Sequence, residues 1–268
     1  MYKLYGALGG ASLAPHCVLE KGGLPYEFIE VNIARDVERD PEYLELNPHG
    51  RIPTLVFDDQ VIIESAAICI YLADKHSHTQ LSPPLDHPDR ASYIQWMVYA
   101  TNTLQETMVL KLYTHKHTDD PDCSDQVASR ASSKLDMIIS FIEQSLGQTE
   151  GPYFLGSGLS TADIYLHMLT AWDPSIKDRV VSSSSTSSIP ADKRLTNIQR
   201  SYQAMLKQPD IAKTFATNGH KITAVTAYGV RFRICRYVYH SWINDSHPSR
   251  KSWHSNHRDG CIDCTFSL

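Results

Sequence analysis

The first eighty residues carry the hydrophobic and polar pattern of a small mixed α/β unit. Residues 25–31 alternate apolar and polar side chains, which is the period-two pattern of a strand, and residues 2–8 also have strand character. Between them, residues 13–21 are predicted to form a helix that ends at a glycine pair. A short polar segment at 36–46 is predicted to be helical. We therefore expect the order strand, helix, strand, helix.

The stretch from Asn47 to Asp74 continues this pattern. Residues 47–50 are a turn cluster, and residues 51–57 form an apolar, β-branched strand. Asp58-Asp59 makes the turn of a hairpin, and residues 60–63 return as a second strand. A helix then begins at Glu64-Ser65 and has an apolar stripe on one face. The complete order is typical of a thioredoxin-like domain, which we place at residues 1–78.

The rest of the chain reads as an all-α domain at 90–219, joined by a Pro-, His- and Ser-rich linker at 79–89. Its predicted helices cover residues 90–113, 125–146, a buried segment from Ser160 to Trp172, and 195–216 with a stop at Gly219. Ser160 and Asp163 resemble a capping box, so we assign both a structural role. The serine run at 181–188 is predicted to be a mobile insertion.

The last segment, 220–268, has a different composition. It carries 7 Lys/Arg against 3 Asp/Glu and contains one possible strand around Val230, Phe232 and Ile234. His254, His257, Cys261 and Cys264 form an H-x2-H-x3-C-x2-C pattern, but the pairs lie closer together than in known zinc fingers. We therefore predict no metal site, and a tail that is disordered or loosely packed.

Charge and cysteine usage narrow the function classes. The chain of 268 residues has a net charge of −5, and residues 1–80 carry 6 Lys/Arg against 12 Asp/Glu, which argues against nucleic-acid binding. No apolar run is long enough to cross a membrane, and the chain begins with strand character rather than a secretory leader. Cys17 and Cys69 fall on predicted helices, as expected for reduced thiols. We expect a cytoplasmic protein that binds neither nucleic acid nor membrane; salt-dependent binding through the tail is the alternative.

Two features of the 47–74 stretch carry chemistry. Pro53 lies inside a strand and removes a backbone donor, so a cis bond at Ile52-Pro53 would leave backbone groups free to pair with a ligand. Glu64-Ser65 stands at a helix start, where free N–H groups attract a carboxylate. Taken singly, Pro53 is more often an ordinary edge proline and Ser65 an ordinary N-cap. Together they predict a site for a small extended peptide with an anionic end.

These residues resemble the glutathione transferases, which bind glutathione through an Ile/Val-Pro turn and a Glu-Ser helix start. The resemblance runs from Met1 to about Gly219. It implies that Ile52, next to Pro53, pairs with the cysteinyl backbone of glutathione, and that Glu64 and Ser65 hold its γ-glutamyl end. It also implies glutathione as co-substrate, no metal, and a homodimer.

The loop from Tyr5 to His16 resembles the bacterial, beta-class-like transferases through its S-L-x-P-H ending. Their reactive cysteine corresponds here to Ala11, and the hydroxyl of serine-type classes corresponds to Gly10. Ser12 is the remaining hydroxyl at the helix start, so we predict it as the catalytic residue and, with Ala11, as part of the glutathione site. A plain structural role for Ser12 stays open, and so does thiolate stabilisation by the N–H groups of Ala11 and Ser12 alone.

The remaining contacts to glutathione and to the second substrate are predicted only from residues expected to lie near this site. His49 or Arg51 would pair with the glycyl carboxylate of glutathione. The helical domain would line the pocket of the second substrate, with these candidates: Tyr99, Thr103, Gln105 and Tyr113. The predicted reaction is attack of the glutathione thiolate on a small, largely apolar electrophile. The alternative is a catalytically inactive relative that binds glutathione or a protein partner.

Overall fold

The structure is a computed structural model that describes residues 1–34, 38–181, 190 and 193–220. All of these residues belong to one compact unit, Met1–Tyr228. The predictions for the tail, including its possible strand and its His/Cys cluster, lie outside the described residues, and so does the serine run beyond residue 181.

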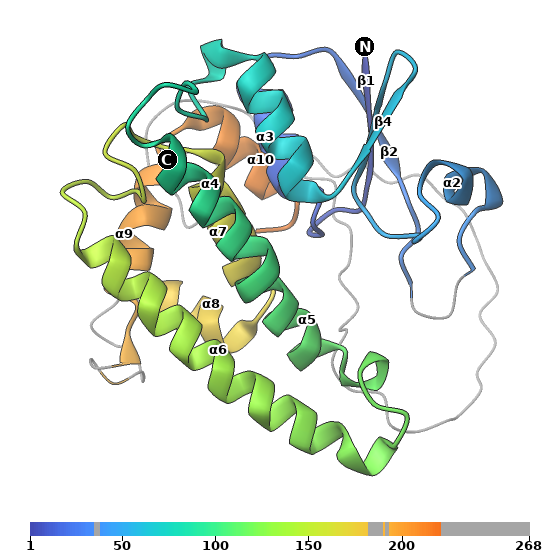
Figure 1. Cartoon of the computed structure of the whole chain (residues 1–268), viewed down its shortest axis with the longest axis vertical. Coiled ribbons are helices and arrows are strands. Elements are labelled where there is room, and N and C mark those ends of the chain that lie inside the picture. Colours follow the sequence, from blue (N-terminus) through green and yellow to red (C-terminus); the bar gives the residue numbers. More distant parts are fainter. Residues whose placement is uncertain (35–37, 182–189, 191–192, 221–268) are drawn as a thin grey trace, which may run out of the picture. The chain divides into compact units, whose positions relative to one another are not determined.

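The sheet at the start of the chain has four strands in the order β2-β1-β3-β4 (Figure 1). Strand β1 (Tyr2–Gly6) pairs parallel with β2 (Tyr26–Glu30) and antiparallel with β3 (Thr54–Phe57). Strand β4 (Gln60–Ile63) returns antiparallel to β3 as the predicted hairpin. The prediction that the first strand extends to Leu8 is wrong, because the strand ends at Gly6 and the chain then turns. This sheet confirms the thioredoxin-like fold class.

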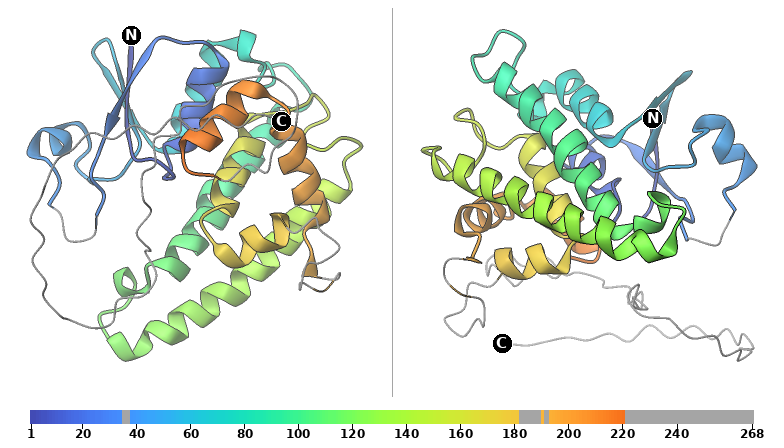
Figure 2. Two further views of the ribbon diagram at one scale, coloured as in Figure 1. Left: turned by 180° about the vertical axis from the view of Figure 1, so that it is seen from behind. Right: turned by 60° about the horizontal axis from the view of Figure 1, so that its bottom comes forward.

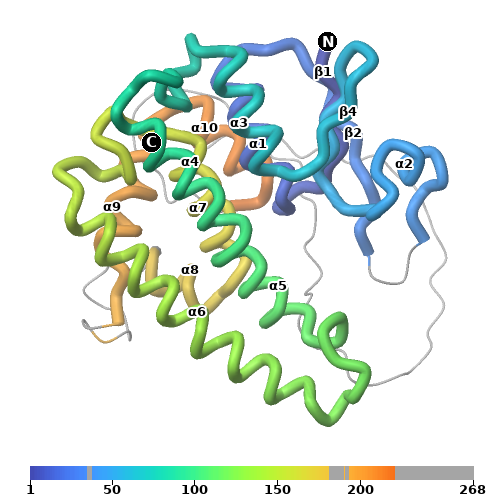
Figure 3. The backbone as a smooth tube through the Cα atoms, in the orientation of Figure 1, coloured from blue at the N-terminus to red at the C-terminus, as the bar shows by residue number. Residues whose placement is uncertain are grey.

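Helices cover both faces of this sheet, as the tube in Figure 3 shows. Helix α1 (Leu13–Lys21) and helix α3 (Ser65–Lys75) contact each other, and the short helix α2 (Pro41–Leu46) lies on the opposite side. Both α1 and α3 begin where the sequence predicts. Cys17 and Cys69 are fully buried on these two helices and are free thiols.

The regular elements in the rest of the described residues are helices, and α5 and α6 run side by side (Figure 2). The helices are α4 (Arg90–Val98), the π-helical η2 (Tyr99–Gln105), α5 (Glu106–Leu112), α6 (Ser124–Gly147), α7 (Thr161–Thr170), α8 (Pro174–Val181), α9 (Thr196–Met205) and α10 (Pro209–Thr217). Short 3₁₀ turns lie at Ser77–Thr79, Thr114–Lys116 and Pro121–Cys123.

Two of the predicted helices need correction. The helix predicted at 90–113 is interrupted by the π-helical turn η2, and the helix predicted at 195–216 is two helices, since Pro209 begins a new one. Helix α8 was not predicted from the sequence. None of the helices in the described part of the chain combines the length and the apolar character that a membrane crossing requires.

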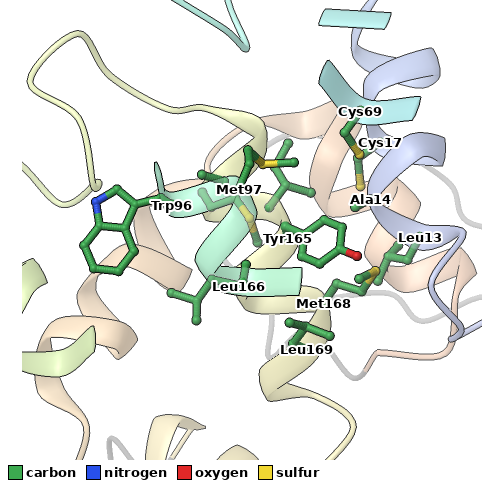
Figure 4. Close-up of a cluster of buried hydrophobic side chains, with 14 of the residues drawn as sticks. Leu13, Ala14, Cys17, Cys69, Trp96, Met97, Tyr165, Leu166, Met168 and Leu169 are labelled. Carbon is green, nitrogen blue, oxygen red and sulfur yellow. The ribbon is translucent and has the colours of Figure 1, made fainter. Parts of the chain in front are cut away.

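Helix α7 is the centre of the core, because all of its residues are buried. Figure 4 shows Tyr165 and Met168 of this helix beside Leu13 of α1 and Met97 of α4. The predicted capping box starts the helix. Asp163 accepts hydrogen bonds from the N–H of Ser160 at 2.9 Å and from its hydroxyl at 2.8 Å. The structural role of this pair is therefore confirmed.

His167 on α7 makes the stability of this core depend on pH. Its side chain is fully buried, Nε2 bonds the Ser201 hydroxyl at 2.9 Å, and Nδ1 has no partner among the described residues. Burial lowers the pKa of His167 to about 3. In the unfolded chain the same ring titrates near 6.5. The unfolded state therefore binds more protons between these values, and folding loses stability as the pH falls below about 6.5.

We expect His167→Asn to remove this dependence. Relative to the wild type, the variant's free energy of unfolding should fall less steeply on acidification, by about 1.4 kcal/mol per pH unit between roughly pH 6 and pH 4. Urea unfolding followed by circular dichroism at several pH values measures the two slopes. Equal slopes for wild type and variant would show that His167 is not held neutral.

Candidate functional site

The hydroxyl of Ser12 is occupied within the loop that precedes α1. Ser12 is fully buried, and its Oγ donates to the Ala7 carbonyl at 2.8 Å and accepts from the Ala7 N–H at 3.2 Å. Gly6 leaves the space for it, since a Cβ atom there would lie 2.4 Å from Ser12 Cβ. This geometry favours the structural role of Ser12 and not the catalytic role predicted from the sequence.

The Ser12 hydroxyl is already bonded, but two backbone N–H groups of this loop are unpaired. The amides of Ala11 and Ser12, just before the first helical residue Leu13, have no hydrogen-bond partner within the described part of the chain. Ala11 retains 8% of its accessible surface. Gly10 packs closely against Ile52, because a Cβ atom on Gly10 would lie 2.9 Å from Ile52 Cδ1. The loop therefore holds two unpaired donors close to the Ile52-Pro53 turn, and of the two residues only Ala11 retains accessible surface.

The start of α3 meets the start of α1. The Ser65 hydroxyl, buried at the first position of α3, donates to the Ala11 carbonyl at 2.6 Å. Glu64 precedes it with φ of 71°, a left-handed conformation that is uncommon outside glycine and clusters at functional sites. The Glu64 side chain is exposed. Two helix N-termini, which both attract negative charge, thus lie against each other.

The Ile52-Pro53 peptide bond is cis. In the described residues, no hydrogen bond uses the N–H or the C=O of Ile52. The carbonyl of the neighbouring Arg51 is fixed by two hydrogen bonds. It accepts one from the Tyr43 hydroxyl at 2.6 Å and one from Asn47 Nδ2 at 2.7 Å. The backbone of Ile52 is therefore held in place while its own polar groups remain available to a ligand.

His49 and Arg51 are exposed beside this turn, as the predicted contact to a glycyl carboxylate requires. The turn between them is held by Arg39, whose Nε donates to the Gly50 carbonyl at 3.0 Å. Both candidate donors therefore stand on a fixed backbone at the edge of the site.

Tyr165 of the helical part connects Gln105 to the start of α3. The Tyr165 hydroxyl donates to Gln105 Oε1 at 2.5 Å and lies beside Ser65. Burial raises the pKa of Tyr165, so the phenol stays protonated and acts as a donor. Thr103 is half-buried on the same π-helical turn. Gln105 is thus linked through Tyr165 to the start of α3.

The other two candidates for the second-substrate pocket have different surroundings. The ring of Tyr99 packs against Trp96 and against Phe141 of α6, with ring centroids 5.6 and 5.5 Å apart. Tyr113, after the end of α5, is 41% exposed. Within the described residues, no hydrogen bond or ring contact joins either of them to Gln105 or to the loop before α1.

Three residues of the site were missed in the sequence. Asn47 was interpreted only as part of a turn, and Tyr43 only as part of a polar helical segment, although it is an aromatic residue among polar ones. Tyr165 sits in the middle of a buried helix and has no local signal. Its role depends on contacts with Gln105 and Ser65, which are 60 and 100 residues away in the sequence.

A mixed four-stranded sheet with a cis-proline turn, followed by a helical part that reaches the same site, defines the two-part architecture of thioredoxin-like transferases. Comparison with known proteins agrees. Residues 1–74 match the family model described as "Glutathione S-transferase, N-terminal domain".

Curated relatives cover both parts of the chain. Glutathione S-transferase hmp2 of Hypomyces subiculosus is 33% identical over an alignment of 174 residues, which covers 61% of this chain and 78% of that protein. Glutathione S-transferase GST-4.5 of Xanthomonas campestris pv. campestris is 30% identical over 171 residues, or 63% and 81% of the two chains. A solved ternary complex of BphK, a bacterial glutathione S-transferase, is 26% identical with a TM-score of 0.66, covering 81% of this chain and 100% of the other. The chain belongs to the glutathione S-transferase family of enzymes.

Proposed function

We propose that this chain binds glutathione between the Ile52-Pro53 turn and the start of α3, and transfers it to an electrophile. The observation that carries the proposal is the bond between the Ser65 hydroxyl and the Ala11 carbonyl, which joins the two helix starts beside Ile52. The free N–H and C=O of Ile52 would pair with the cysteinyl backbone. The Glu64 carboxylate would bind the γ-glutamyl ammonium, and the N–H groups at the start of α3 its carboxylate. Arg51 or His49 would pair with the glycyl carboxylate.

The thiol would be activated by backbone amides. Lowering the pKa of a thiol by two units takes about 2.7 kcal/mol of preferential thiolate stabilisation. One charge-assisted hydrogen bond contributes about 1.5–3 kcal/mol, and a helix N-terminus adds about 0.3–1 kcal/mol. The unpaired N–H groups of Ala11 and Ser12, at the start of α1, are therefore sufficient. The thiolate would then attack the electrophilic carbon, and the leaving group would depart with the bonding electron pair.

The second substrate would be a small, largely apolar electrophile held by the helical part. We propose Thr103 and Gln105 for this role, because both lie on the π-helical turn and Gln105 bonds Tyr165. We keep the division into a glutathione-binding part at 1–78 and a helical part at 90–219, and we propose a cytoplasmic location from the two buried free thiols.

A homodimer is also proposed. Apolar side chains are exposed on neighbouring helices α4 and α6, with Val98 at 49%, Met137 at 68% and Phe141 at 46%. Met137 and Phe141 are one turn apart on α6, and exposed apolar side chains that lie together are typical of an interface. Sedimentation velocity measures the state directly, and a monomer at micromolar concentration would refute this proposal.

Retention on immobilised glutathione, followed by conjugation of an aryl halide, tests the proposed function. We expect the wild type to be retained and to form the conjugate. A chain that is neither retained nor active would overturn the proposal.

Ser12→Ala separates the two ways of activating the thiol. The variant leaves the Ala7 N–H and C=O without their buried partner, so its free energy of unfolding should fall by about 1–3 kcal/mol. The kcat of the folded variant should fall by no more than about tenfold, because the loop loses an anchor at Ala7 while its amides remain. A kcat loss of about a hundredfold with glutathione binding retained would instead show that the Ser12 hydroxyl activates the glutathione thiol.

A further inference from the structure

Gly9, in the loop before α1, is held on both sides by side chains of the helical part. Its N–H donates to Asn218 Oδ1 at 3.1 Å, and its C=O accepts from Trp172 Nε1 at 3.0 Å. Trp172 follows α7 and Asn218 follows α10. They lie 163 and 209 residues from Gly9 in the sequence. Both polar backbone groups of one residue are therefore fixed from the other part of the molecule.

The orientation of Asn218 is determined by its other partners. It is 3% exposed, and its Nδ2 donates to the Thr214 carbonyl at 2.8 Å and lies 3.3 Å from His16 Nδ1. Only Nδ2 can donate to both acceptors, so Oδ1 must face the Gly9 N–H. The opposite amide orientation would place Nδ2 against the Gly9 N–H, donor against donor.

His16 extends this arrangement to the surface of α1. Its Nε2 lies 2.6 Å from the Tyr26 hydroxyl, which donates to Glu20 at 2.5 Å. The Tyr26 hydroxyl uses its proton on Glu20, so His16 Nε2 must carry the proton and Nδ1 must be the acceptor. Burial lowers the pKa of His16, which keeps the ring neutral, as this role requires. One consistent set of donors and acceptors thus runs from Glu20 to the loop.

The loop requires such support because of its composition. Gly9 has φ of 75°, and it is followed by Gly10, so two residues without side chains precede the amides of Ala11 and Ser12. Glycine leaves the backbone more conformations than any other residue. Thiolate stabilisation requires donors aligned to within about 0.5 Å. An unsupported glycine pair would not hold that alignment.

We infer that Trp172 and Asn218 are positioning residues of the transfer reaction, because they fix Gly9 and thereby aim the amides of Ala11 and Ser12 at the thiolate. The inference rests on the proposed function. It gives the helical part a role in activating glutathione as well as in binding the second substrate.

The test uses Trp172→Phe, which keeps an aromatic ring and removes the donor, and Asn218→Ala. Matched controls are Trp96→Phe, at a tryptophan stacked on Phe154, and Asn197→Ala, at an asparagine whose Nδ2 also bonds a backbone carbonyl. For each full-length protein we would measure glutathione affinity by calorimetry, kcat with an aryl halide between pH 6 and 9, and amide exchange in peptides covering residues 7–12.

We expect both test variants to bind glutathione within about threefold of the wild type, to lose about tenfold in kcat near pH 6.5, and to recover part of that loss at high pH. Exchange of the loop amides should be about tenfold faster, and the controls should match the wild type. An active wild type whose test variants keep the same kcat, pH profile and loop exchange would overturn the inference alone. A wild type without glutathione binding or conjugation would overturn the proposed function, and the positioning role with it.

Discussion

Replacing Asp163 by alanine is expected to lower the free energy of unfolding by about 3 kcal/mol or more. The fully buried carboxylate accepts from the N–H of Phe154 at 3.0 Å as well as from the N–H and the hydroxyl of Ser160. Its removal leaves these donors buried without an acceptor, each at a cost of about 1–3 kcal/mol, and removes the cap of the most buried helix. Urea unfolding at pH 7, followed by circular dichroism, measures the difference.

Asp89 provides the matched control. Its carboxylate also accepts a backbone bond, from the N–H of Ser157 at 2.8 Å, but it lies at the surface. Asp89→Ala should therefore change the free energy of unfolding by about 1 kcal/mol or less. If both variants lose the same small amount, Asp163 is not the anchor of α7 that its contacts indicate.

Replacing Glu64 by glutamine is expected to raise the KM for glutathione by about ten- to a hundredfold. The substitution preserves the size of the side chain and removes the charge that would bind the γ-glutamyl ammonium. A hydrogen bond between charged groups is worth about 1.5–3 kcal/mol, and each 1.4 kcal/mol is a factor of ten. Because the Glu64 side chain is exposed and makes no hydrogen bond within the described residues, the thermal stability should not change. Steady-state kinetics at saturating electrophile give the KM, and calorimetry gives the affinity.

Glu27→Gln, at an exposed position of strand β2, removes the same charge far from the helix starts and should leave the KM as in the wild type. An equal change in both variants would indicate a general effect of the acidic surface. An unchanged KM in Glu64→Gln would remove Glu64 from the site and leave the γ-glutamyl end to the backbone of α3.

The sequence was informative where the chemistry is local. Ile52, Pro53, Glu64 and Ser65 lie within fourteen residues, in a stretch whose strand, hairpin and helix signals are all strong. Their mutual placement follows once that stretch folds. The cis bond at Pro53 and the helix start at Ser65 are therefore found where the pattern predicts.

The rest of the site depends on contacts between distant segments. Nothing near Trp172 or Asn218 in the sequence indicates that they reach Gly9. The Ser12 hydroxyl bonds the backbone of Ala7 because the chain turns there. Ala7 was expected to lie inside the first strand, so this contact was not predicted. Helix α8 was missed because it is short and largely polar, and the break before Pro209 was missed although proline is a known first residue of helices.

The π-helical turn Tyr99–Gln105 has an evolutionary consequence. Such a turn holds one residue more than the α-helical path between the same ends, and it commonly arises from a single insertion within a helix. Loss of one codon here would restore the α-helix with its flanking turns in place, and it would change which residues of the turn stand beside Gln105. A lineage could thus exchange the residues that this helix offers to an incoming substrate by a change in length, without any substitution.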